Sequence, residues 1–110
     1  MGVIIMKYNY SSEGFLNELK NIYNFNVEEY NIYLDQWPLL KLKLNQQQLN
    51  TISNKKNSID TIIRRCEIQA NNIHPINAGI INTTNLELHG DKLIIKGSET
   101  VIRLILKEIF

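Results

Sequence analysis

Residues 86–95 read Leu-Glu-Leu-His-Gly-Asp-Lys-Leu-Ile-Ile, and this stretch decides the fold class. Leucines alternate with polar residues before a Gly-Asp pair and an apolar run follows it, which is typical of two strands joined by a two-residue turn with glycine first. Such a turn pairs His89 with Lys92 and Leu88 with Leu93. The stretch therefore predicts an antiparallel hairpin with one buried face. That face comprises Leu86, Leu88, Leu93 and Ile95.

The same alternation occurs earlier in the chain, in residues 30–35 and again in residues 40–44. Every second residue is apolar, and Lys41 and Lys43 occupy the alternate positions of the second run. Period-two patterning of this kind indicates strands with one face in water. We expect a second hairpin here, with a lysine-bearing exposed face. An apolar run at residues 3–8 predicts one further strand.

Three segments have the 3.6-residue periodicity of helices. The first follows Ser11 and Ser12, with apolar residues from Phe15 to Tyr23, Ile22 among them. The second runs from Ser58 to residue 73, with Asp60 and Arg64 one turn apart as an expected ion pair. The third covers residues 99–110, with Ser98 as its N-cap. Residues 45–57 are polar and predict a loop or one short helix, and residues 71–83 predict a long connection.

The expected elements give the order βαββαββα within one domain, residues 1–110. We therefore predict an α+β class: a mostly antiparallel sheet with helices packed on one face. The first six elements match the order of the split βαβ, or ferredoxin-like, topology, with an added strand and helix.

The apolar stripe of the last helix covers more than half of its circumference, which is wider than one sheet can bury. Two interpretations are open. Either the chain's own loop or another helix covers the rest, or the stripe is an interface of a homodimer or with a partner. The interface residues would be Ile102, Leu106, Ile109 and Phe110.

Composition indicates the kind of source and the cellular compartment of the protein. Ile and Asn supply 33 of 110 residues, a skew that favours a low-GC source such as a microbe, phage or mobile element. No apolar run is long enough for a membrane helix or a signal-peptide core, and the single cysteine agrees with a reducing compartment. We therefore expect a cytoplasmic protein that does not enter the membrane.

Residues with catalytic chemistry are few. Cys66 lies in the apolar stripe of the second helix, where a buried thiol is the usual occupant. Two histidines and one cysteine give no zinc pattern, and the five glycines are scattered without a phosphate loop. Glu87, His89 and Asp91 on the last hairpin are the remaining acid–base candidates for a small enzyme. We expect a protein without catalytic residues, cofactor or metal that acts through its surface.

Charge is distributed unevenly along the chain. Residues 1–35 carry two lysines and five carboxylates, whereas residues 36–65 carry six basic residues and one carboxylate. The leading hypothesis is a non-enzymatic protein-binding module, such as an inhibitor or immunity-type protein that blocks a nuclease or another nucleic-acid-binding protein. An acidic surface would steer it to a basic groove. The acidic residues are Glu13, Glu18, Glu28, Glu29 and Asp35.

The alternative hypothesis uses the basic middle segment. Clustered lysine and arginine attract phosphate whatever the sequence of the nucleic acid, which suggests a nucleic-acid-binding accessory protein. The basic residues are Lys41, Lys43, Lys55, Lys56, Arg64 and Arg65.

Overall fold

The computed structural model describes residues 10–33, 36–73 and 84–110. The predicted strand at residues 3–8, Asp35 and most of the predicted connection at 71–83 lie outside the described residues. The elements, in chain order, are α1 (Tyr10–Asn21), β1 (Asn26–Tyr33), β2 (Gln36–Lys43), α2 (Gln46–Asn54), the short 3-10 helix η1 (Lys56–Ser58), α3 (Ile59–Ile73), β3 (Asn85–His89), β4 (Lys92–Lys96) and α4 (Glu99–Ile109).

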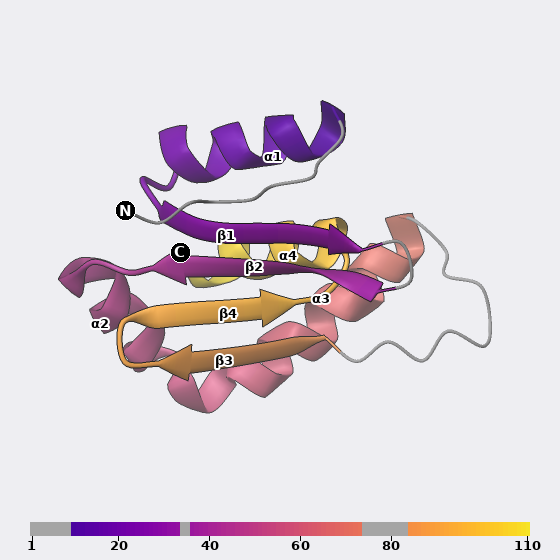
Figure 1. Ribbon diagram of the computed structural model, residues 1–110. Helices are drawn as coiled ribbons and strands as arrows, with labels where there is room; N and C mark the ends of the chain where they lie inside the picture. The colour runs from indigo at the N-terminus through magenta and orange to yellow at the C-terminus, as the bar shows by residue number, and fades with distance from the viewer. Residues whose placement is uncertain (1–9, 34–35, 74–83) are drawn as a thin grey trace.

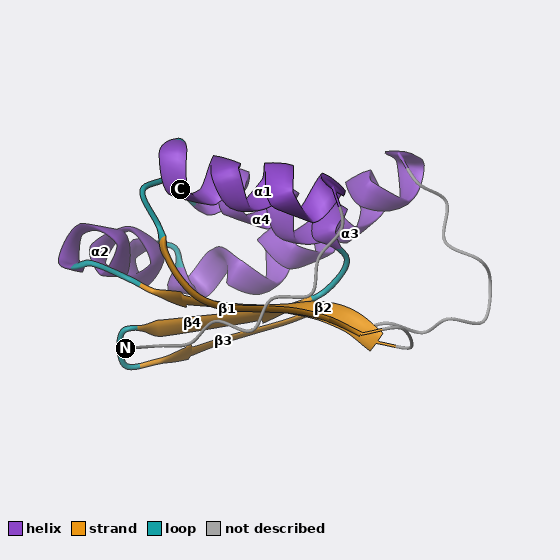
Figure 2. Ribbon diagram, turned by 45° about the horizontal axis from the view of Figure 1, so that its top comes forward, coloured by secondary structure: helices purple, strands orange, loops and turns teal. Residues whose placement is uncertain are grey.

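The four described strands form one antiparallel sheet in the order β1-β2-β4-β3 (Figure 1). Two hairpins, β1 with β2 and β3 with β4, are joined side by side through β2 and β4. Helices α1, α3 and α4 lie on the same side of this sheet (Figure 2). The predicted α+β class, with an antiparallel sheet and helices on one face, is confirmed.

The four described strands do not follow the ferredoxin-like order. In a ferredoxin-like sheet the first strand of the chain would lie beside the second strand of the first hairpin, which here is β2. Strand β2 instead has β1 on one side and β4 on the other, so both of its neighbouring positions are taken. The order of elements along the chain could not reveal this, because it does not state which hairpin edges meet.

The hairpin of β3 and β4 has the predicted register. His89 pairs with Lys92 and Leu88 pairs with Leu93. Gly90 has a φ of 62°, which suits the first central residue of a type II′ turn and which side chains other than glycine rarely adopt. Leu93 and Ile95 are fully buried, so this hairpin directs the predicted face toward the helices.

Helix α4 lies within the core. Ser98 Oγ accepts a hydrogen bond from Val101 N–H, as the predicted N-cap requires. Ile102 and Leu106 are completely inaccessible to solvent and Ile109 nearly so, while the Phe110 ring packs edge-on against Phe25. The chain's own sheet and helices therefore cover Ile102, Leu106 and Ile109, whereas Phe110 is only partly buried.

Helix α2 occupies the polar segment for which a loop or one short helix was predicted. Asn45 and Gln48 form a reciprocal capping box, in which each side chain accepts a hydrogen bond from the other's backbone N–H. The Gln48 amide also donates to the carbonyl oxygens of Tyr23 and Asn24. The short-helix alternative is correct, and the buried glutamine ties α2 to the turn before β1.

One residue assigned to the buried face of the first helix is exposed. Helix α1 ends at Asn21, and Asn24 then takes a left-handed φ of 56°. The chain turns there, with Phe25 N–H donating to Leu19 O. Ile22 is 70% exposed as a result.

Candidate functional site

The described sheet has two edge strands, β1 and β3, and they differ in regularity. The pairing of β1 with β2 is irregular at two places, between Val27 and Glu29 and between Asn31 and Tyr33. Bulges of this kind twist an edge and interrupt its repeat of backbone groups, which discourages a further strand. Strand β3 pairs with β4 residue by residue along its whole length. Among the described strands, β3 is therefore the edge suited to accept another strand.

Two backbone hydrogen bonds show to which neighbouring strand each residue of β4 directs its backbone N–H and C=O groups. Leu44 N–H donates to Asp91 O at 2.8 Å, and Gly97 N–H donates to Pro38 O at 3.1 Å. Alternate residues of an antiparallel strand direct their backbone groups to opposite sides. The odd-numbered residues of β4 therefore bond to β2, and the even-numbered ones bond to β3.

The consequence for β3 follows from its register. The partners of the even-numbered β4 residues are Asn85, Glu87 and His89, so these three use their backbone groups toward β4. Leu86 and Leu88 direct their N–H and C=O groups away from the sheet. They are the backbone groups that an added strand would meet.

A groove of about 410 Å³ lies beside this edge, on the helix side of the sheet. Most of its lining is apolar, and Leu88, 40% exposed, borders it. A strand added to β3 would place every second side chain on the same side as Leu86 and Leu88, above this groove. The groove is lined by Ile52, Ser53, Lys56, Ile59, Asp60, Leu86 and Leu88.

Helix α3 runs alongside β3 in the opposite direction. Glu67 Oε2 accepts a hydrogen bond from the backbone N–H of Thr84, just before β3 begins, while Asp60 and Lys56 line the groove near the end of β3. Figure 1 shows the first turns of α3 next to β3 at the edge of the sheet. Asp60 and Arg64 are four residues apart on α3 and so lie on the same side of the helix, and Lys56 of η1 lines the groove together with Asp60. We call Lys56, Asp60 and Arg64 the charged row.

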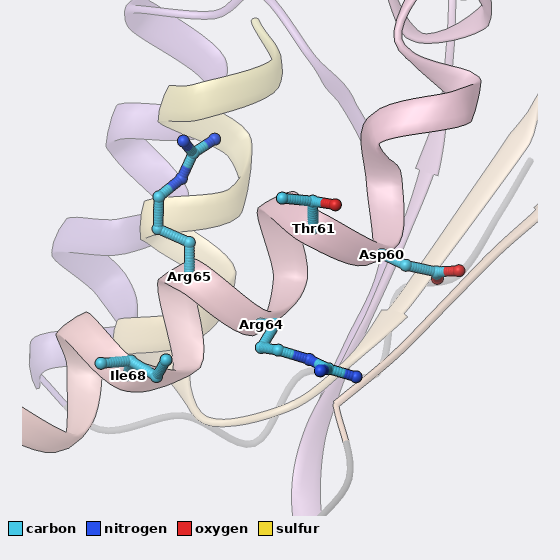
Figure 3. Close-up of a pocket in the computed structure, with 5 residues that line it drawn as sticks. All are labelled: Asp60, Thr61, Arg64, Arg65 and Ile68. Atoms are coloured by element: carbon cyan, nitrogen blue, oxygen red, sulfur yellow. The ribbon is translucent and has the colours of Figure 1, made fainter.

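The exposed side of α3 also carries an open hollow of about 550 Å³ (Figure 3). The side chains of Asp60 and Arg64 point to one side of the helix, and Arg65 points to the other, along α4. Arg65 is paired with Glu108 at 2.6 Å. Among the described residues the predicted Asp60–Arg64 ion pair is not formed. The hollow is lined by Asp60, Thr61, Arg64, Arg65 and Ile68.

The acidic residues of the leading hypothesis are largely engaged within the chain. Glu18 pairs with Arg103 at 2.8 Å and Glu28 pairs with Lys92. Glu29 accepts a hydrogen bond from the Asn31 amide. Glu13 is exposed on α1, and Asp35 lies outside the described residues. The structure does not gather the described acidic residues into one uncompensated surface.

The basic residues of the alternative hypothesis lie on two sides of the sheet. Lys41 and Lys43 alternate with buried leucines, so they project from the face away from the helices. Lys56, Arg64 and Arg65 belong to η1 and α3 on the helix side.

Lys55 is held within the chain. Its Nζ donates to the carbonyl oxygens of Glu108 and Ile109, and so caps the end of α4. The six basic residues therefore do not form one patch.

The candidate catalytic residues lie in unrelated settings. Cys66 is buried in the core, and that burial, with a smaller contribution from Glu108, raises the pKa of its thiol. His89 Nε2 lies 3.7 Å from Glu87 Oε2, but both side chains are more than half exposed on the strand. Within the described part of the chain, no group of three or more His, Cys, Asp or Glu side chains is placed to hold a metal ion.

The groove beside β3 was not predicted from the sequence. Its lining comes from α2, η1, α3 and β3, and short-range periodicity does not tell which of these elements meet. Leu88 was available as a signal, because it is the last apolar residue of a regular strand before the turn. The sequence assigned it to the buried face with Leu86, but at the sheet edge it is only partly covered.

Comparison with family models, with curated proteins and with solved structures finds no match to this chain. Among its described helices, none has the length and apolar character needed to cross a membrane.

Proposed function

We propose that this chain is a small protein-binding module that accepts an extended segment of a partner protein as a further strand beside β3. The observation that carries the proposal is the pair of outward-facing backbone positions, Leu86 and Leu88, next to an apolar groove. Backbone hydrogen bonds would hold the segment, and side-chain pockets would select its sequence. The partner segment should carry apolar residues at two alternate positions.

The magnitudes favour a modest affinity for an isolated segment. Each added backbone hydrogen bond contributes about 1 kcal/mol net, and one branched apolar side chain in the groove contributes about 2 kcal/mol. Ordering the segment and immobilising it oppose binding by several kcal/mol. A partner that already holds the segment extended would bind more tightly than a free peptide, which suits recognition of a folded protein.

The sequence also suggested a more specific role, in which an acidic surface of this protein blocks a basic groove of its target. That role depends on the acidic residues of the first third of the chain and not on β3. Glu18 and Glu28 already have cationic partners within the chain. We therefore base the binding function on β3 rather than on the acidic first third. An inhibitor or immunity-type role would then rest on strand addition to the target.

The test is selection from a display library of random short peptides, followed by titration of the selected peptides against three proteins. Leu88→Lys places a charge at the groove, and Ile22→Lys is the matched control, because Ile22 is an exposed apolar residue outside the groove lining. We expect peptides with alternating apolar residues that bind the parent and Ile22→Lys equally. Their affinity for Leu88→Lys should fall by about tenfold or more. Equal binding to Leu88→Lys, or failure to select any peptide, would refute the proposal.

A further inference from the structure

We infer that the segment bound at β3 carries a carboxylate side chain beside its apolar residues, and that Arg64 binds this carboxylate. The inference rests on the proposed function, because it names the chemistry of the segment at the same edge. It comes from the charged row on η1 and α3 formed by Lys56, Asp60 and Arg64, of which Lys56 and Asp60 line the groove and Arg64 lies one turn further along α3.

Lys56 and Arg64 are the cationic members of this row, and Arg64 is the one that lies beyond the groove, toward the start of β3. Its side chain is exposed and, among the described residues, has no ion pair or hydrogen-bond partner, unlike its neighbour Arg65 with Glu108. A guanidinium presents a planar fork that matches a carboxylate. The residue is therefore free to pair with an incoming segment without breaking an existing contact.

The position of Arg64 along β3 defines where the carboxylate must be. Glu67, three residues after Arg64, contacts the backbone of Thr84, so this turn of α3 lies at the beginning of β3. Figure 3 shows Arg64 and Asp60 directed to the same side of the helix. Lys56 and Asp60, of opposite charge, both line the groove, so their effects on a carboxylate placed there offset one another. The row thus favours apolar residues over the groove and an acidic residue next to the start of β3.

Three synthetic peptides test the inference. All share the same alternating valines; one has Glu after them, one has Glu before them and one has Gln at both places. Each is titrated at low salt against the parent, Arg64→Gln and the matched control Arg65→Gln, with binding followed by NMR signals of Leu86 and Leu88. We expect one Glu peptide to bind about three- to tenfold more tightly than the Gln peptide. The place of its Glu reports whether the added strand is antiparallel or parallel to β3.

The gain should disappear in Arg64→Gln, persist in Arg65→Gln and shrink at high salt. If the Gln peptide binds as tightly as both Glu peptides, or if the gain survives in Arg64→Gln, the inference is wrong and strand addition at β3 still stands. If no peptide shifts the signals of Leu86 and Leu88, the proposed function fails as well.

Discussion

The Tyr30 hydroxyl donates a 3.0 Å hydrogen bond to Glu99 Oε2, which joins the edge strand β1 to the first turn of α4. Tyr30 is fully buried, and the Phe15 ring packs against its ring with the centroids 5.5 Å apart. Glu99 also pairs with Arg103, one turn further along α4, at 3.5 Å. This bond therefore fixes the helix on the sheet while placing a carboxylate at the helix N-terminus, where it is favoured.

Replacing Tyr30 by Phe should lower the free energy of unfolding by about 1 kcal/mol, because it removes this bond and leaves the partly buried Glu99 carboxylate less well satisfied. Urea denaturation followed by circular dichroism measures the change. Tyr23→Phe is the matched control, since the half-buried Tyr23 ring makes a stacked contact with Phe25 that the change preserves. An equal loss in both variants would mean that the Tyr30 hydrogen bond contributes nothing specific.

Lys55 should stabilise the protein through the end of α4. Its ammonium group lies 2.8 Å from Ile109 O and 3.0 Å from Glu108 O, where it satisfies terminal carbonyls and interacts favourably with the helix dipole. Lys55→Met should therefore lower the free energy of unfolding by about 1 kcal/mol. Lys56→Met, at the exposed neighbouring position, should change it by less than about 0.5 kcal/mol. Thermal denaturation of the two variants measures the difference. Equal losses in Lys55→Met and Lys56→Met would mean that Lys55 acts only as a surface charge and not as a cap of α4.

The sequence predicts those parts of the fold that depend on neighbouring residues. The alternation around Gly90 determines the register of β3 with β4, and Ser98 determines where α4 begins. Both arise from local turn and capping geometry, so a short stretch of sequence suffices.

What the sequence does not predict is which elements meet. The apolar stripe of α4 left two interpretations open, and Ile102 is buried by other parts of the same chain. Likewise, the likeness to a ferredoxin-like order does not predict that β2 pairs with β4. The groove beside β3 depends on such long-range contacts, and so does the position of Arg64 on the turn of α3 near the start of β3.

Two glycines should respond to alanine with opposite signs. Gly90 has a φ of 62°, so a side chain there is strained, and Gly90→Ala should destabilise the protein by about 1 kcal/mol. Gly14 lies within α1, and a methyl group there would meet no atom within 4 Å. Gly14→Ala should stabilise the protein by about 0.5–1 kcal/mol through helix propensity. Chemical denaturation of the two variants would contradict the assigned conformations if both changes had the same sign.

Cys66 should be unreactive in the folded protein. Burial, with a contribution from Glu108, raises the pKa of its thiol, so at neutral pH the reactive thiolate is scarce as well as inaccessible. We expect slow reaction with an aromatic disulfide reagent, and fast reaction once denaturant unfolds the chain. Comparable rates in the folded and unfolded protein would show that the thiol is exposed.

The same raised pKa predicts how stability depends on pH. The folded state holds the thiol proton more tightly than the unfolded state. The contribution of the protonated Cys66 thiol to the free energy of unfolding is therefore fully present below the ordinary pKa of cysteine, and it is lost as the pH rises through the raised pKa of the folded state. The decline in unfolding free energy at alkaline pH should therefore be shallower in Cys66→Ala than in the parent, which urea titrations over that range would measure.

Strand β3 makes the most direct prediction about the candidate site, because its backbone amides alternate in direction. The amides of Glu87 and His89 point toward β4, and those of Leu86 and Leu88 point away from the sheet. Hydrogen exchange followed by NMR should therefore show slow exchange at Glu87 and His89. Exchange at Leu86 and Leu88 should be faster by about tenfold or more, since a free amide exchanges without local opening.

Adding a selected peptide should slow exchange at Leu86 and Leu88 and leave Glu87 and His89 as they were. Leu86→Pro provides an independent check, because proline is tolerated at an edge position whose N–H faces outward but cannot donate to an added strand. This variant should keep the pairing of β3 with β4 and weaken peptide binding. Slow exchange at Leu86 and Leu88 in the free protein would mean that the edge is already occupied, and strand addition by a partner would then be ruled out.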